Sequence, residues 1–152
     1  MGSGILLEGE AAEVVLGEAQ AVRAMVQDEN RRAQLAGLIA AVADGEVSDD
    51  EAEALTELLE LGLQTGRLRA LYGPGGEQAA LKAFRRLPRG KALGDSAREV
   101  SEALASLTGK KLEKVHIQAT APGAFLITIG VEGLELSVRL DRQGARLTSV
   151  GI

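Results

Sequence analysis

Leu134-Glu135-Leu136-Ser137-Val138-Arg139-Leu140 decides the fold of the C-terminal third of this chain. Apolar and polar residues alternate along this stretch without interruption, so its apolar side chains all point to one side of an extended backbone. That alternation is typical of a strand with one buried face. The chain is therefore expected to build a sheet around residues 134–140.

Alternation on both sides extends this sheet. Residues 115–120 and 125–131 alternate in the same way, and 145–150 is expected to form a shorter fourth strand. Turn sequences separate the strands at Pro122-Gly123, Glu132-Gly133 and residues 141–144. Because connections this short join only antiparallel neighbours, we predict a four-stranded antiparallel meander.

Upstream of residue 108, apolar residues recur with the 3.6-residue period of amphipathic helices. One apolar stripe covers residues 7–26 and carries a single charged residue, Glu18. A second stripe ends at residues 44–45, where glycine is a common helix stop. The segment 28–30 either separates these two helices or is read through.

Ser48 and Glu51 form a capping box, in which each side chain bonds to the backbone of the other residue, so a third helix begins here. This helix is expected to end near residues 62–66. A short turn over 67–72 and a break at the Gly-Pro-Gly-Gly segment 73–76 then precede a fourth helix.

The fourth helix is expected to end at Pro88, because proline does not continue a helix. Residues 89–94 then form a linker. A second capping box, Ser96 with Glu99, opens a fifth helix, which Gly109 closes.

These elements predict an α+β protein of two domains. The first, over residues 1–90, is a bundle of about four helices. The second, over residues 91–152, is a helix packed on the four-stranded antiparallel meander.

Composition excludes several classes of protein. The chain of 152 residues is 45% hydrophobic, too apolar for a disordered polymer. No apolar run approaches the ~18 residues needed to span a bilayer, and the start at Met1 lacks the basic and long apolar parts of a leader peptide. Without cysteine there is no disulfide, thiol nucleophile or Cys-bound metal. We expect a cytoplasmic protein with no membrane partner.

The net charge of −5 conceals an asymmetry along the chain. Residues 1–60 have a net charge of −11, residues 61–100 of +5 and residues 101–152 of +1. Either the acidic helices pack near the basic ones, or a partner supplies the complementary potential. The strongest positive cluster, a candidate interaction surface, consists of Lys82, Arg85, Arg86, Arg89 and Lys91.

Between the second and third helices the chain reads Ala43-Asp44-Gly45-Glu46-Val47-Ser48-Asp49-Asp50-Glu51. Over residues 33–63 this helix, acidic turn and helix resembles the signature of the tellurite-resistance TerB-like family. The resemblance implies a helical, stress-linked bacterial domain whose acidic residues bind metal. On the matching positions it nominates Asp44, Glu46, Asp49 and Asp50 as divalent-metal ligands.

The same segment also matches the later part of a calcium loop. The first and third loop positions are, however, Ala40 and Val42, which offer no side-chain oxygen, so high-affinity calcium binding is not expected. Two interpretations stay open: a tight turn between helices capped by Ser48, and a weak divalent-metal site.

No catalytic group of residues is evident. The single histidine, His116, is expected on the polar face of the sheet opposite Thr128, with no nucleophile nearby. We predict that the protein is not an enzyme and has no organic cofactor. Tyr72, Phe84 and Phe125 are the only aromatic residues, too few to stack bases, so nucleic acid is not an expected partner.

The leading hypothesis is a noncatalytic interaction module, acting as an adaptor or a self-associating scaffold. Phe125, Leu126 and Ile127 make the second strand apolar on both faces, and such a strand needs a cover from the helical half or from another subunit. One alternative is a TerB-like domain that responds to metal or ligand. A second alternative is weak anion or RNA binding through residues 82–91.

Overall fold

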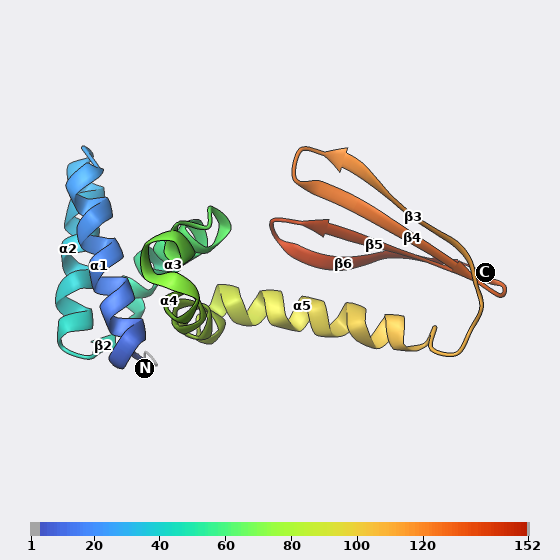
Figure 1. Cartoon of the computed structure of the whole chain (residues 1–152), viewed down its shortest axis with the longest axis horizontal. Helices are drawn as coiled ribbons and strands as arrows, with labels where there is room; N and C mark the ends of the chain where they lie inside the picture. Colours follow the sequence, from blue (N-terminus) through green and yellow to red (C-terminus); the bar gives the residue numbers. More distant parts are fainter. Residues whose placement is uncertain (1–3, 152) are drawn as a thin grey trace. The chain divides into compact units, whose positions relative to one another are not determined.

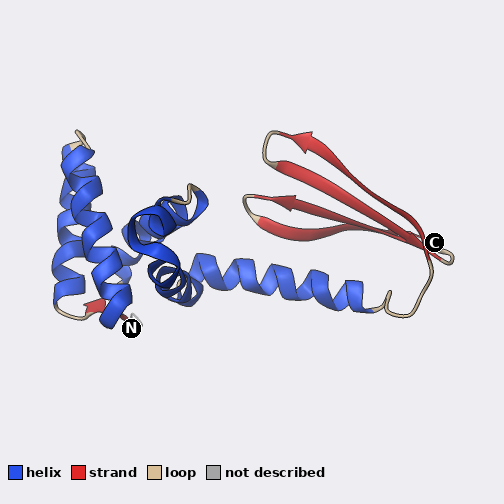
Figure 2. Ribbon diagram, in the orientation of Figure 1, coloured by secondary structure: helices blue, strands red, loops and turns tan. Residues whose placement is uncertain are grey.

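The computed structural model describes residues 4–151, so the chain start at Met1–Ser3 and the final Ile152 lie outside the described residues. The chain divides into two compact units, Met1–Gly90 and Lys91–Ile152. Helices form the N-terminal part, and a four-stranded antiparallel sheet follows them (Figures 1 and 2). The predicted α+β class is confirmed.

Four helices build the helical unit: α1 (Gly9–Met25), α2 (Glu29–Ala43), α3 (Asp49–Gln64) and α4 (Arg67–Arg86). Figure 1 shows α1 and α2 side by side. Residues 26–28 separate them, and the Asp28 carboxylate caps α2 by accepting a hydrogen bond from the Asn30 amide at 3.2 Å. The two-residue strands β1 (Ile5–Leu6) and β2 (Glu46–Val47), which pair antiparallel, were not predicted.

The core of this unit is made of aliphatic side chains from all four helices. Helix α1 packs against α2 and α4, and α3 packs against α4. Burying one such side chain contributes roughly 1.5–3 kcal/mol. The largest fully buried aliphatic residues of this unit are Leu7, Val15, Leu35, Leu38, Val47, Leu55, Leu59, Leu68 and Leu87.

The expected turn over 67–72 is wrong, because this segment is already helical. Gly73 alone leaves the helical conformation, with φ 74° and ψ 177°, and Pro74 opens the next helical part, where its missing N–H is not needed. One glycine absorbs the whole kink, so Leu68 before it and Ala80 after it are both buried in the core.

The expected linker over 89–94 is also wrong. Helix α5 (Pro88–Ala105) begins at its proline and runs through this segment. Ser96 therefore lies inside the helix, and its hydroxyl donates to the Leu93 carbonyl at 3.0 Å instead of capping with Glu99. Helix α4 ends at Arg86, directly before Pro88 as predicted, because the extended Leu87 precedes the proline. Pro88 also starts α5, which fits its preference for the first helical turn.

The sheet has the predicted strands and turns. Strands β3 (Leu112–Ala121), β4 (Ala124–Val131), β5 (Leu134–Asp141) and β6 (Gly144–Gly151) form an antiparallel meander in chain order. Gly123 and Gly133 have φ of 76° and 70°, the left-handed conformation that tight hairpin turns require.

Candidate interaction surface

The register of the sheet collects its hydrophobic residues on one face. Val115 pairs with Ile129, Ile129 with Leu136, and Leu136 with Val150. Paired residues in an antiparallel sheet point to the same side, so each row of pairs belongs to one face. We call the following fifteen residues the apolar face: Leu112, Val131, Leu134; Val115, Ile129, Leu136, Val150; Ile117, Ile127, Val138, Leu147; Ala119, Phe125, Leu140 and Ala145.

Two irregularities in the pairing complete this face. The register shifts between Leu112 and Lys114 on β3, and again opposite Ser137 and Val138 on β5. An extra residue in a strand reverses the alternation beyond it, which brings Leu112 and Val150 back to the apolar side. The sequence did not predict the positions of Leu112 and Val150, because alternation alone does not reveal a bulge.

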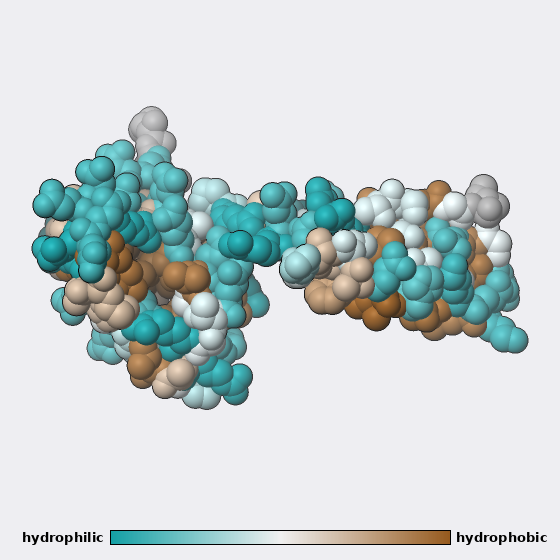
Figure 3. Space-filling model, turned by 90° about the horizontal axis from the view of Figure 1, so that it is seen from above, coloured by the Kyte–Doolittle hydropathy of each residue, from teal (hydrophilic) through white to brown (hydrophobic). Residues whose placement is uncertain are grey.

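Much of the apolar face is uncovered. On β3, Leu112, Val115 and Ile117 expose 56%, 57% and 59% of their surface. Phe125, Leu147 and Val150 are also exposed. Together with the three residues on β3 they are the exposed large hydrophobic residues within 91–151, and all six belong to the apolar face. Figure 3 shows hydrophobic surface gathered on the part of the chain that carries the strands.

Helix α5 covers only part of the face. Val100 is buried, and a hollow of about 310 Å³ lies between α5 and the first residues of β6, lined by Val100, Ala145 and Leu147 among others. On β5, Leu136 and Val138 are buried, whereas β3 is exposed along all ten of its residues. Strand β3 and the second half of β6, where Leu147 and Val150 are exposed, are therefore the parts of the apolar face left open.

The opposite face of the sheet carries Leu126 on β4, as expected, but is otherwise mainly polar and holds ion pairs. Lys114 Nζ lies 3.7 Å from a Glu135 carboxylate oxygen. Asp141 accepts hydrogen bonds from the Gln143 amide at 2.8 Å, from Arg146 at 3.0 Å and from Arg139 at 3.1 Å. The hydrogen bond from the Gln143 amide, followed by those from the two arginines, lowers the pKa of Asp141.

His116 lies on this polar face, in register with Thr128 as expected. The histidine is exposed, and Thr128 is buried between its neighbours. No carboxylate or nucleophile is hydrogen-bonded to His116 within residues 4–151.

The predicted basic cluster divides into paired and unpaired residues. Arg89 Nη2 lies 3.2 Å from a Glu60 carboxylate oxygen, so this member of the cluster forms an ion pair with the acidic helix α3. Lys82, Arg85 and Arg86 are exposed on α4 and make no ion pair within the described chain. Lys91, also exposed, belongs to the sheet unit. Anion binding by this cluster stays a prediction.

The residues nominated as metal ligands lie in three elements. Asp44 caps the end of α2, Glu46 lies on β2, and Asp49 and Asp50 lie in the first turn of α3. Within residues 4–151, no three or more Asp, Glu or His side chains converge closely enough to hold a metal ion. Metal binding at these residues stays a prediction.

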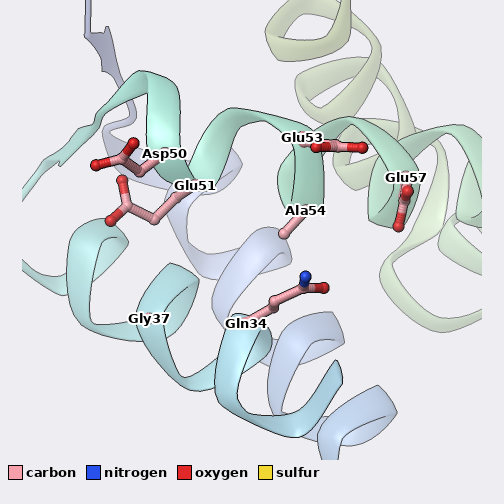
Figure 4. Close-up of a pocket in the computed structure, with 7 residues that line it drawn as sticks. All are labelled: Gln34, Gly37, Asp50, Glu51, Glu53, Ala54 and Glu57. Carbon is pink, nitrogen blue, oxygen red and sulfur yellow. The ribbon is translucent and has the colours of Figure 1, made fainter. Parts of the chain in front are cut away.

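The capping box before α3 is confirmed, since the Ser48 amide donates to Glu51 at 3.2 Å. Beside it, a hollow of about 210 Å³ lies between α2 and α3 (Figure 4). Ligand pockets usually enclose ~300–1,000 Å³ and have apolar walls. This hollow is smaller, and its residues are mainly polar: Gln34, Gly37, Asp50, Glu51, Glu53, Ala54 and Glu57.

Glu18 is the one buried charged side chain of the described chain, with 1% of its surface exposed. Arg67 Nε donates to both of its carboxylate oxygens, at 2.8 and 3.0 Å. Burial and then the Glu18 charge raise the pKa of the neighbouring Tyr72. The arginine satisfies the carboxylate, so the pair joins α1 to α4.

No family model, no curated protein and no solved structure matches the chain. The resemblance to the TerB-like family therefore stays a prediction. Among helices within residues 4–151, none is both long and apolar enough to cross a membrane.

Proposed function

We propose that this chain is a noncatalytic protein-interaction module that binds its partner through the apolar face. One observation carries the proposal: fifteen hydrophobic residues share one side of the sheet, and the side chains on β3 are more than half exposed. Proteins that act as monomers rarely expose a contiguous apolar patch of this kind, and such patches mark binding surfaces.

The chemistry of the face favours a macromolecular partner over a small substrate. Its rows hold only aliphatic residues and Phe125, so no polar group on it orients a ligand or transfers a proton. Exposed aliphatic residues around one aromatic side chain instead resemble the apolar centre of a protein interface. The ion pairs on the opposite face support the same assignment, because that side already satisfies its own charges.

Two neighbouring positions on β3 test the proposal. Ile117→Lys places a charge on the apolar face, whereas Gln118→Lys places the same charge on the opposite face of the same exposed strand. Crosslinking in cells that express the chain, followed by mass spectrometry, should recover a protein partner, a second copy included. Binding should be lost in Ile117→Lys and kept in Gln118→Lys.

Circular dichroism and cooperative urea unfolding must first show that both variants are folded. If the wild-type chain crosslinks to no protein, or if both variants keep the same partners, the apolar face is not a docking surface.

A further inference from the structure

We infer that the partner seated on the apolar face is a second copy of this chain, related to the first by a twofold axis. The inference rests on the proposed function, since it names the occupant of the same surface.

The area of the face is the first support. Its four strands are eight to ten residues long. With strands ~4.8 Å apart and a rise of ~3.4 Å per residue, the face measures roughly 19 by 27 Å, or about 500 Å². Two such faces together measure roughly 1,000 Å², and the buried Val131, Leu136 and Val138 contribute little of it. The contact therefore lies at the small end of specific interfaces, which fits a dimer that exchanges with its monomer.

Charge is the second support. None of the residues of the apolar face is ionised, so an identical copy meets no like charge across the contact. The sheet unit, residues 91–152, holds eight basic and seven acidic side chains, a net charge of +1. The whole chain carries −5, but this unit, which bears the apolar face, adds almost no net repulsion between copies. A partner recognised by charge would instead need charged residues on this face.

Symmetry is the third support. In a twofold dimer the same patch serves both subunits and must be complementary to itself. A sheet face made only of hydrophobic residues meets this condition, because two such faces pack ~10 Å apart with their strands within about 30° of each other. The contact centres on β3 and β4, where Val115, Ile117 and Phe125 are exposed.

Sedimentation equilibrium of the purified full-length chain tests the inference. The wild type and Gln118→Lys should sediment as dimers. Ile117→Lys should sediment as a monomer, with self-association weakened at least tenfold. Val115→Thr with Ile117→Thr is a milder variant that keeps β-branched residues in the strand, and it should weaken the dimer in the same direction.

A wild-type chain that is monomeric at the highest attainable concentration would overturn the inference. The proposed function would survive that result if crosslinking still recovered a different protein through Ile117. A dimer that persists in both Ile117→Lys and the double threonine variant would also overturn it, because the contact would then lie elsewhere. A monomer that binds phospholipid vesicles through Ile117 would refute both proposals.

Discussion

Glu18 interrupts the apolar stripe of α1, yet it is buried in the helical unit. Arg67 from α4 compensates the charge with two hydrogen bonds. Removing one member of a buried ion pair leaves an unpaired charge, whereas replacing both members by apolar residues is often neutral. A single substitution therefore measures the cost of the unpaired charge, and the net contribution of the pair to stability is measured only when both residues are replaced.

Arg67→Met should lower the free energy of unfolding by roughly 1–3 kcal/mol, because the Glu18 carboxylate loses its only arginine. The arginine is itself 38% exposed, which keeps the loss below that of a fully buried pair. Adding Glu18→Leu should restore most of the stability. Urea unfolding measures the wild type, Arg67→Met, Glu18→Leu and the double variant.

Arg69→Met is the matched control, since Arg69 is 66% exposed and lies 3.9 Å from Glu77. It should change stability little. Strictly additive effects of the Glu18 and Arg67 substitutions would show that the two residues are not coupled.

Asp141 makes the stability of the folded sheet depend on pH. Its pKa is lowered from 3.8 in the folded chain, so its contribution to stability is present above that ordinary value. The contribution is lost as the pH falls through the lowered value, where the folded carboxylate takes up its proton.

Asp141→Asn should thus be less stable than the wild type near neutral pH, and the two should converge in strong acid. Urea unfolding across this range is the measurement, with Glu132→Gln in an exposed turn as the charge-matched control. A stability difference that stayed constant with pH would contradict the role assigned to the Asp141 hydrogen bonds.

Among the elements, α5 shows how much the surroundings of a glycine matter. Gly94 and Gly90 both lie in this helix. A Cβ added at Gly94 meets nothing within 4 Å, whereas one added at Gly90 would collide with the Phe84 carbonyl oxygen. The same substitution should therefore have opposite effects at the two positions.

Gly94→Ala should raise the free energy of unfolding by about 0.5–1 kcal/mol, because alanine loses less backbone entropy in a helix. Gly90→Ala should lower it, because the backbone of α4 or α5 must shift to admit the methyl group. Thermal unfolding followed by circular dichroism compares the variants. Equal shifts at both positions would refute the close approach at Gly90.

At the scale of the whole molecule, the stability of the sheet is expected to depend on concentration. Association that occurs only in the folded state stabilises that state by mass action. The midpoint of thermal unfolding should rise with protein concentration in the wild type and in Gln118→Lys. It should stay constant in Ile117→Lys, and calorimetry over a concentration series measures the difference.

Local sequence patterns predicted most of the secondary structure. Alternation in residues 115–150 depends only on neighbouring positions, and the turn glycines have the positive φ that their places require. Ser48 and Glu51 are three positions apart, so their capping box was also predictable. Proline and glycine misled the prediction at 67–72 and 89–94, because neither residue by itself shows whether it starts, kinks or ends a helix.

The candidate surface was predictable only in part. Val115, Ile117 and Phe125 follow the simple alternation, so the sequence by itself determined that one side of the sheet is hydrophobic. Only the tertiary structure decided that Leu112 and Val150 join that side through bulges, that α5 leaves β3 open, and that Arg67 compensates Glu18. The physical reason is distance along the chain: a repeating pattern records what adjacent residues prefer, whereas pairing, cover and charge compensation depend on residues that only folding brings together.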